Sequence, residues 1–214
     1  MTTVASAFER ATALVPLGER TWRAACDGAW STQLGVNGGF IAALVLRAMI
    51  AELEDPEREA RSLTCHYLRP PEIGEVRMEV ARERSGRTLS TLTARVTQGD
   101  RLCVIAVAAF AVDLPGIVDY ASAPPHAQAM YADAWLPSPM PRLTRPAFAP
   151  TVDLTVHFRS PAAAAATTDE YVFVTFRSST SAGGFFEEDG ELWSRDGVLL
   201  AHSRQLALLL GDRS

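Results

Sequence analysis

The sequence predicts an α+β protein made of two copies of one unit, in each of which an antiparallel sheet wraps around a long central helix. The first observation is a repeat: LTCHYLRP at residues 63–70 returns as LTVHFRSP at residues 154–161. The second is the order of elements, because each half has a helix-like run followed by strand-like runs. The third is that both halves end alike, with a GD or DG turn before a largely apolar strand. One unit alone would expose a sheet edge, which a second unit can cover.

The helix of the first half begins after GVNGG at residues 35–39 and continues through the apolar run 40–53. Asn37 can cap this helix, and the glycines allow close backbone approach at its start. The run is apolar on almost every side, so we expect the helix to be buried. Residues 55–61, DPEREAR, are expected to end it as a charged loop.

The strands of the first half follow this loop. Charged and apolar residues alternate in the middle strands, whereas the last strand is nearly all apolar. The pairs GR at 86–87 and GD at 99–100 are hairpin signals between strands. This pattern favours an antiparallel sheet with one face against the buried helix. The expected strands are residues 63–70, 75–85, 88–98 and 101–112.

The second half repeats this order after a Pro-containing bridge at residues 113–125. A helix-like run at 126–137 precedes a Pro-rich loop at 137–150. We therefore divide the chain into two units, residues 1–115 and 116–214. The strands expected in the second unit are residues 154–161, 171–180, 190–197 and 198–210.

Composition excludes several classes of protein. The chain has 214 residues and a net charge of −5, and all 20 basic residues are Arg, so it lacks the basic excess of a nucleic-acid-binding protein. Three cysteines without a CxxC pair predict neither a disulfide framework nor a metal site. The longest apolar run is interrupted by Arg47 and is too short to span a membrane. There is no signal peptide, GxSxG elbow or phosphate-binding loop, so we expect a cytoplasmic protein.

Six stretches in this order resemble one known family. They are GVNGGFIAALVLRAM, LTCHYLRPPEIGEV, GRTLSTLTARVTQGD, ADAWLPSPMPRL, PTVDLTVHFRSP and GELWSRDGVLLAHSRQLALL, and they span roughly residues 28 to 210. The chain resembles double-hotdog acyl-CoA thioesterases of the TesB type, in their actinobacterial branch. The resemblance implies a double hotdog fold, an acyl-CoA substrate, no cofactor, and a homodimer or higher homo-oligomer.

The second half departs from the family pattern in one respect. About 30 residues precede the helix of the first half, which is enough for an opening strand pair, but the bridge at 113–125 cannot supply one. Either the second unit is truncated, or a stretch is missing from this sequence near Ser122–His126. A helix without its preceding strand would leave a sheet edge unpaired, which favours a missing stretch.

Three residues correspond to the catalytic positions of the family. The resemblance assigns an Asp of the second central helix to Asp133, a Ser or Thr at the start of the next strand to Thr151, and a Gln of the last strand to Gln205. Asp133 would deprotonate a water molecule that Thr151 and Gln205 hold in place. From the residues alone, Asp133 also suits a capping or solvent-facing helix position, Thr151 an ordinary strand position, and Gln205 an edge or outward-facing position. The residue near Val107 or Ala108 that matches Gln205 is apolar, so we expect one site in each chain.

Other candidates concern substrate binding. Gly38 or Gly39 at the start of the first helix can offer a backbone N–H to the thioester oxygen, or can serve helix packing only. Trp135, Phe185 and Phe186 can line an acyl tunnel or belong to the core. We place the two phenylalanines in a GGFFEEDG loop and expect its acidic residues to be solvated.

Histidines and arginines were the remaining candidates. His66 and His157 are related by the repeat and are expected to be hydrogen-bonded core or interface histidines rather than bases. Four arginines can meet the phosphates of coenzyme A or form surface ion pairs, namely Arg69, Arg142, Arg145 and Arg159.

The sequence thus predicts an acyl-CoA thioesterase that produces a free fatty acid and coenzyme A. Two alternatives stay open. One is a non-hydrolytic protein that binds acyl-CoA or lipid. The other is an enoyl-CoA hydratase, although no segment carries the adjacent Asp and His that this chemistry uses.

Overall fold

The computed structural model describes residues 6–32, 35–112, 129, 131–133, 137–142, 147–159 and 172–211. The first half contains α1 (Ala7–Ala11), β1 (Val15–Gly18), β2 (Thr21–Cys26), η1 (Gly28–Trp30), β3 (Ser31–Thr32), β4 (Gly35–Val36), α2 (Gly38–Leu53), β5 (Arg58–Tyr67), β6 (Gly74–Ser85), β7 (Leu89–Gln98) and β8 (Arg101–Val112). The second half contains η2 (Met140–Arg142), β9 (Ala147–Phe148), β10 (Thr151–Phe158), β11 (Phe173–Arg177), β12 (Ser181–Ala182), β13 (Phe185–Trp193), β14 (Leu199–Leu208) and β15 (Leu210–Gly211).

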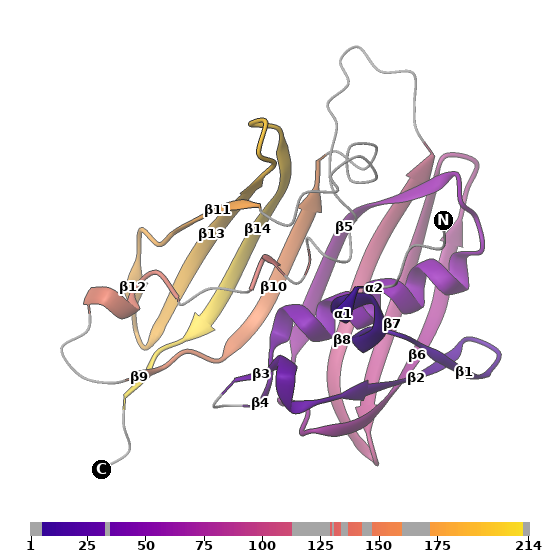
Figure 1. The fold of residues 1–214 in the computed structure, drawn as a ribbon, viewed down its shortest axis with the longest axis horizontal. Helices are drawn as coiled ribbons and strands as arrows, with labels where there is room; N and C mark the ends of the chain where they lie inside the picture. The colour runs from indigo at the N-terminus through magenta and orange to yellow at the C-terminus, as the bar shows by residue number, and fades with distance from the viewer. Residues whose placement is uncertain are drawn as a thin grey trace.

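The helix α2 is the centre of the first half. Asn37 caps it, because its side-chain Oδ1 accepts a hydrogen bond of 2.9 Å from the N–H of Phe40. Figure 1 shows α2 lying across the strands of the first half. The helix is buried along nearly its whole length, as its apolar sequence predicts. It ends at Leu53, and β5 begins at Arg58, so the expected loop at 55–61 is shorter than predicted.

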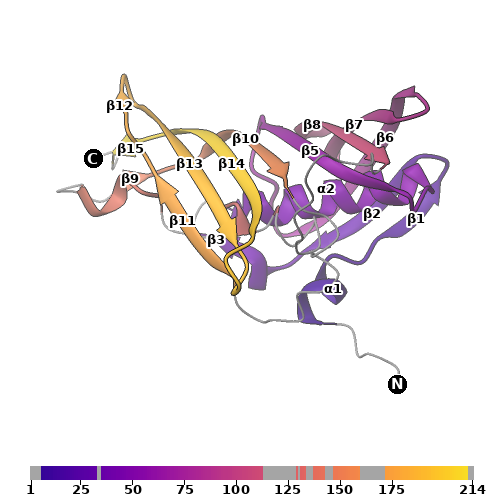
Figure 2. The ribbon, with the colours of Figure 1, turned by 90° about the horizontal axis from the view of Figure 1, so that it is seen from above.

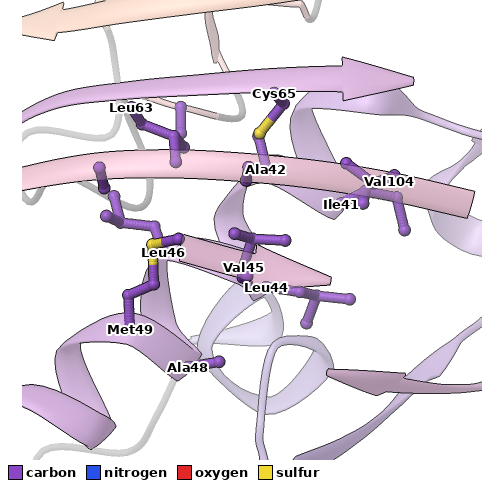
Figure 3. Close-up of a cluster of buried hydrophobic side chains, with 14 of the residues drawn as sticks. Ile41, Ala42, Leu44, Val45, Leu46, Ala48, Met49, Leu63, Cys65 and Val104 are labelled. Carbon is purple, nitrogen blue, oxygen red and sulfur yellow. The ribbon is translucent and has the colours of Figure 1, made fainter. Parts of the chain in front are cut away.

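The core forms where α2 meets the sheet. Figure 3 shows side chains of the sheet, such as Leu63 and Cys65, beside those of the helix, such as Ala42 and Val45. All four are buried with at most 1% of their surface exposed. Burial of this apolar surface supplies the main stabilisation of the first half.

Eleven strands from both halves form one antiparallel sheet, and the pairs β3–β4 and β9–β15 form two small sheets of their own. The order of the large sheet is β1-β2-β6-β7-β8-β5-β10-β14-β13-β11, with β12 paired to β13. The first half forms one part of this sheet and the second half continues it, as Figures 1 and 2 show. The hairpins predicted around GR and GD in the first half are present as β6–β7 and β7–β8.

This single sheet corrects the prediction of two separate sheets, each around its own helix. The halves join because β5 and β10 pair with each other, so the inner edge of each half is hydrogen-bonded to the other half. Among the residues that the structure describes, α2 is the one long helix. Most of the expected second helix, residues 126–137, lies outside the described residues, although Ala129 and Tyr131 are helical.

The repeated sequences at residues 63–70 and 154–161 lie at this junction between β5 and β10. The two copies run antiparallel, with Thr64 opposite its own equivalent Thr155, and their hydroxyl groups are 3.1 Å apart. The junction is therefore a local twofold relation between the halves. The missing stretch expected near Ser122–His126 falls outside the described residues and stays a prediction. Within the described ranges, no helix is both long and apolar enough to cross a membrane.

Candidate active site

A pocket lies between the start of α2, the end of β5 and the segment that leads into β10. Its volume is about 690 Å³, within the range of small-molecule sites. Most of its lining is apolar, with a few polar side chains such as Asn37, Asp133 and Thr151. The apolar lining includes Val36, Ile41, Pro71, Met140, Phe148 and Leu208.

Asp133 is the carboxylate of this pocket. Its Oδ2 accepts a hydrogen bond of 3.0 Å from the N–H of Gly39, in the first turn of α2. Burial raises the pKa of Asp133 to about 6, and the negative charge of Glu188 also raises it, while the N–H groups of Gly39 and Gly38 lower it. A carboxyl group with this pKa is ionised at neutral pH and is a stronger base than an ordinary Asp.

Neighbouring side chains fix Asp133 on the helix terminus. The Asn37 Nδ2 donates a hydrogen bond of 3.0 Å to the main-chain oxygen of Asp133. Tyr67 lines the pocket and donates its hydroxyl to the main-chain oxygen of Gly38 at 2.7 Å. A Cβ atom at Gly38 would lie 2.7 Å from Oδ2 of Asp133, so only glycine leaves room for the carboxylate.

Thr151 and Gln205 form the second part of the site. Thr151 starts β10 and lines the pocket, and its hydroxyl donates to Oε1 of Gln205 at 3.1 Å. Gln205 lies in β14, where it is only 5% exposed. Its Nε2 donates to Oε1 of Glu188 at 2.7 Å. The other oxygen of Glu188 accepts hydrogen bonds from the N–H and the hydroxyl of Ser138.

The structure therefore brings the three predicted catalytic residues to one place. Asp133 and Thr151 line the same pocket, and Gln205 lies behind Thr151. Gly38 and Gly39, at the start of α2, lie beside Asp133. In this state, however, the N–H of Gly39 binds the carboxylate and is not open to a ligand.

Other substrate-binding candidates lie elsewhere. Phe185 and Phe186 belong to β13, which corrects the GGFFEEDG loop to a strand. Phe186 is buried in the sheet, Phe185 is exposed, and neither is among the described residues that line the pocket. Trp135 lies outside the described residues.

Among the histidine and arginine candidates whose side chains the structure describes, only Arg69 lines the pocket. His66 and His157 are exposed, and neither belongs to the described lining of the pocket. Arg69 is exposed and lines the pocket. Arg159 donates to Nδ1 of His202 at 3.2 Å. The side chains of Arg142 and Arg145 lie outside the described part of the chain.

Glu188 was not predicted to belong to the site, because the acidic residues of GGFFEEDG were expected to be solvated. Glu188 is 3% exposed because β13 alternates, placing Phe186, Glu188 and Leu192 on the buried face. The strand period of FFEEDGELW carried this signal, but the glycines before it suggested a loop. The described residues hold no group of three or more His, Cys, Asp or Glu side chains arranged to bind a metal ion.

Two family models match the chain. The model of the acyl-CoA thioesterase N-terminal domain matches residues 26–111, and that of the C-terminal domain matches residues 117–209. Together they cover more than half of the sequence and meet close to the predicted boundary between the two units. The chain has no match among curated protein sequences.

Solved structures share the fold at low sequence identity. A conserved protein of unknown function with a hot dog fold from Alicyclobacillus acidocaldarius has a TM-score of 0.86 and 22% identity, over 98% of this chain and 100% of that chain. An acyl-CoA thioesterase II from Mycobacterium marinum has a TM-score of 0.81 and 19% identity, over 98% and 99% of the chains. A TesB protein of Mycobacterium avium subspecies paratuberculosis has a TM-score of 0.79 and 18% identity, over 94% and 98%.

Proposed function

The chain belongs to the acyl-CoA thioesterase family and is a thioester hydrolase, and on this premise we propose that it hydrolyses fatty acyl-CoA with a water molecule activated by Asp133. The observation that carries the proposal is that Asp133 and Thr151 line one largely apolar pocket, while Thr151 is hydrogen-bonded to Gln205. The apolar lining suits an acyl chain, and the polar groups suit a water molecule next to its thioester.

The proposed reaction begins with water between Asp133 and Thr151. Asp133 takes a proton from the water, and the water oxygen forms a bond to the thioester carbonyl carbon. The carbon–sulfur bond then breaks, and its electron pair stays on sulfur. The protonated Asp133 returns its proton to the thiolate, so the products are coenzyme A and a fatty acid.

The thioester oxygen gains negative charge during the attack and needs a hydrogen-bond donor. We propose that the first turn of α2 supplies it, through the N–H groups of Gly38 and Gly39. Asp133 engages Gly39 when it is ionised. Once Asp133 has taken the proton, its carboxyl group is a weaker acceptor and can move away, so that the fixed N–H donates to the charged thioester oxygen instead.

The test is the release of coenzyme A from acyl-CoA esters with chains of about four to 18 carbons, using the wild type and Asp133→Asn. The expected result is release that falls by roughly 10²–10⁴-fold in the variant, as for loss of a general base. The control is Asp189→Asn, which removes a carboxylate that is 53% exposed and pairs with Arg204. Equal rates in the wild type and Asp133→Asn would refute the role of Asp133.

Detection by a thiol reagent must account for the protein's own thiols. Cys26, Cys65 and Cys103 are buried and free. Burial raises the pKa of Cys65 to about 12 and that of Cys26 to about 11, so these thiols react slowly in the folded protein. Saturable acyl-CoA binding without any release would instead support the binding-protein alternative. A homodimer or higher homo-oligomer is also part of the proposal, and light scattering tests it.

A further inference from the structure

The buried carboxylate of Glu188 takes no part in the reaction proposed above. Glu188 and Gln205 lie opposite each other on β13 and β14 and are 3% and 5% exposed. The carboxylate accepts from Nε2 of Gln205 at 2.7 Å, and its second oxygen accepts from two groups of Ser138. A charged group is costly to bury unless it is bonded in this way.

In the first half of the chain, the positions equivalent to Glu188 and Gln205 carry apolar residues. In the first half Leu92 pairs with Ala108, and in the second half Glu188 pairs with Gln205 at the same place in the repeat. Leu63 of β5 lies opposite Ala108 of β8, and its repeat equivalent, Leu154 of β10, lies opposite Gln205 of β14. Ala108 and Gln205 are therefore equivalent positions of the repeat.

Thr151 has an apolar equivalent as well. This equivalent is Ala60. Thr151 lies opposite Ala207 beside a bulge in β10, and Ala60 lies opposite Phe110 beside a bulge in β5. Ala60, Leu92 and Ala108 are all buried with at most 2% of their surface exposed. The fold therefore accepts an apolar set at these positions, so the polar set of the second half needs a reason other than folding.

We propose that Glu188 is a positioning residue that fixes the amide of Gln205 with its nitrogen toward β13 and its oxygen toward Thr151. This inference rests on the proposed function. An ionised carboxylate only accepts hydrogen bonds, so the amide nitrogen must face it. The amide oxygen then faces Thr151 and takes the proton of its hydroxyl. The lone pairs of the Thr151 oxygen are thereby left to accept a hydrogen bond from the water in the pocket.

The charge of Glu188 has a second effect on the site. It raises the pKa of Asp133, which strengthens this carboxylate as a base. Glu188 thus acts on both sides of the water position, through Gln205 and through the electric field at Asp133, without lining the pocket itself.

The first test is Glu188→Gln. A glutamine offers a donor where the carboxylate has only acceptors, so the Gln205 amide is free to flip and the water loses its fixed partner. The expected result is a kcat roughly ten- to hundred-fold lower at an unchanged KM, since one charge-assisted hydrogen bond is at stake. The acidic limb of the pH profile should also move to lower pH, because loss of the charge lowers the pKa of Asp133.

The matched control is Glu187→Gln on the same strand. Glu187 accepts hydrogen bonds from Ser179 and Thr180 on the exposed side, away from the site. We expect it to keep the wild-type rate and pH profile. A kcat and an acidic limb in Glu188→Gln equal to those of Glu187→Gln would overturn the inference while wild-type hydrolysis stands. No hydrolysis by the wild type on any acyl-CoA would defeat the proposed function first.

A double variant separates positioning from folding. Glu188→Leu with Gln205→Ala copies Leu92 and Ala108 of the first half. We expect it to fold and to unfold cooperatively, with a melting temperature lowered only by the lost acceptors of Ser138 and Thr151, and to lose activity as fully as Gln205→Ala alone. A double variant that fails to fold would show that the charge is structural and would overturn the inference.

Discussion

The carboxylate of Asp133 is hydrogen-bonded to the N–H of Gly39 at 3.0 Å, although the two residues are 94 positions apart and belong to different halves of the chain. The proposed base, which belongs to the second half, therefore lies at the N-terminus of the helix of the first half. An anion is favoured there because the first N–H groups of a helix have no partner within it. The site consequently needs both halves, which explains why one pocket is lined by α2 and by β10.

The first prediction concerns pH. With a pKa of about 6, Asp133 is protonated below that pH and cannot accept a proton from water. We expect kcat/KM to fall on the acid side with an apparent pKa near 6, and the rate to stay high toward pH 8. The measurement is CoA release between pH 4.5 and 8.5, with substrate well below KM. A limb near pH 4 would contradict a base whose pKa is raised by burial.

The second prediction is that the same residue costs stability. The folded-state pKa of Asp133 is raised from 3.8 to about 6, so the native state holds this proton more tightly than the unfolded state. The resulting stabilisation is present below pH 3.8 and is lost as pH rises through 6. At pH 8 we expect Asp133→Asn to be more stable than the wild type by about 1–3 kcal/mol. We expect the lower part of this range, because the Asp133 side chain lines the pocket, where solvent screens its charge.

Urea unfolding of both proteins at pH 8 and at pH 4 measures this difference. The gain of Asp133→Asn should shrink toward zero at pH 4, where the wild-type carboxyl group is protonated as well. Asp189→Asn, on the exposed side of β13, serves as the control and should show no gain that depends on pH in this way. A variant less stable than the wild type at pH 8 would contradict the assignment.

The third prediction concerns Gly38, which has no side chain and so leaves space for the carboxylate of Asp133. A methyl group at Gly38 would lie 2.7 Å from Oδ2 of Asp133 and 3.3 Å from Cζ of Tyr67. Gly38→Ala should therefore displace the carboxylate and lower kcat by roughly tenfold or more, as misplacement of a catalytic group does. The helix itself should tolerate Ala, which is a better helix former than Gly.

Gly28→Ala is the matched control. Its added methyl group would meet only Cδ1 of Ile73, at an ordinary contact distance of 3.7 Å. We expect this variant to keep wild-type kcat, measured with the same acyl-CoA. Full activity in Gly38→Ala would show that Asp133 does not need its present position.

The sequence predicted the first half closely and the second half less well. The hairpins of β6, β7 and β8 were predictable because alternating strands flank GR and GD. The single sheet was not, because its joining pair, β5 and β10, depends on two segments that are far apart in the chain. Asp133, Thr151 and Gln205 followed from the family resemblance. From the residues alone, structural positions explained Asp133 and Thr151 better than catalysis did, and explained Gln205 equally well. Glu188 was missed because its inward orientation depends on where β13 begins.

The fourth prediction concerns the joint between the halves. The hydroxyl groups of Thr64 and Thr155 face each other at 3.1 Å in this joint. Replacing one by Val leaves the other partly buried without its partner, at a cost of about 1 kcal/mol. Replacing both leaves two β-branched apolar side chains that suit a strand pair. We expect each single variant to be less stable than the double variant, with activity unchanged in all three. A double-mutant cycle by urea unfolding measures the coupling, and strictly additive effects would contradict a direct interaction.

The last prediction tests which part of the substrate meets Arg69. Arg69 is exposed and lines the pocket, and we propose that its guanidinium group binds a phosphate of coenzyme A. We expect Arg69→Ala to raise KM for acyl-CoA about three- to tenfold at low salt, with kcat unchanged, because an exposed charge contributes modestly and is screened by ions.

The same acyl group on pantetheine, which has no phosphate, should show no change in KM. Arg159→Ala is the control, since that side chain is bonded to His202 and should not affect KM. An equal rise in KM with both substrates would mean that Arg69 shapes the pocket and does not bind phosphate.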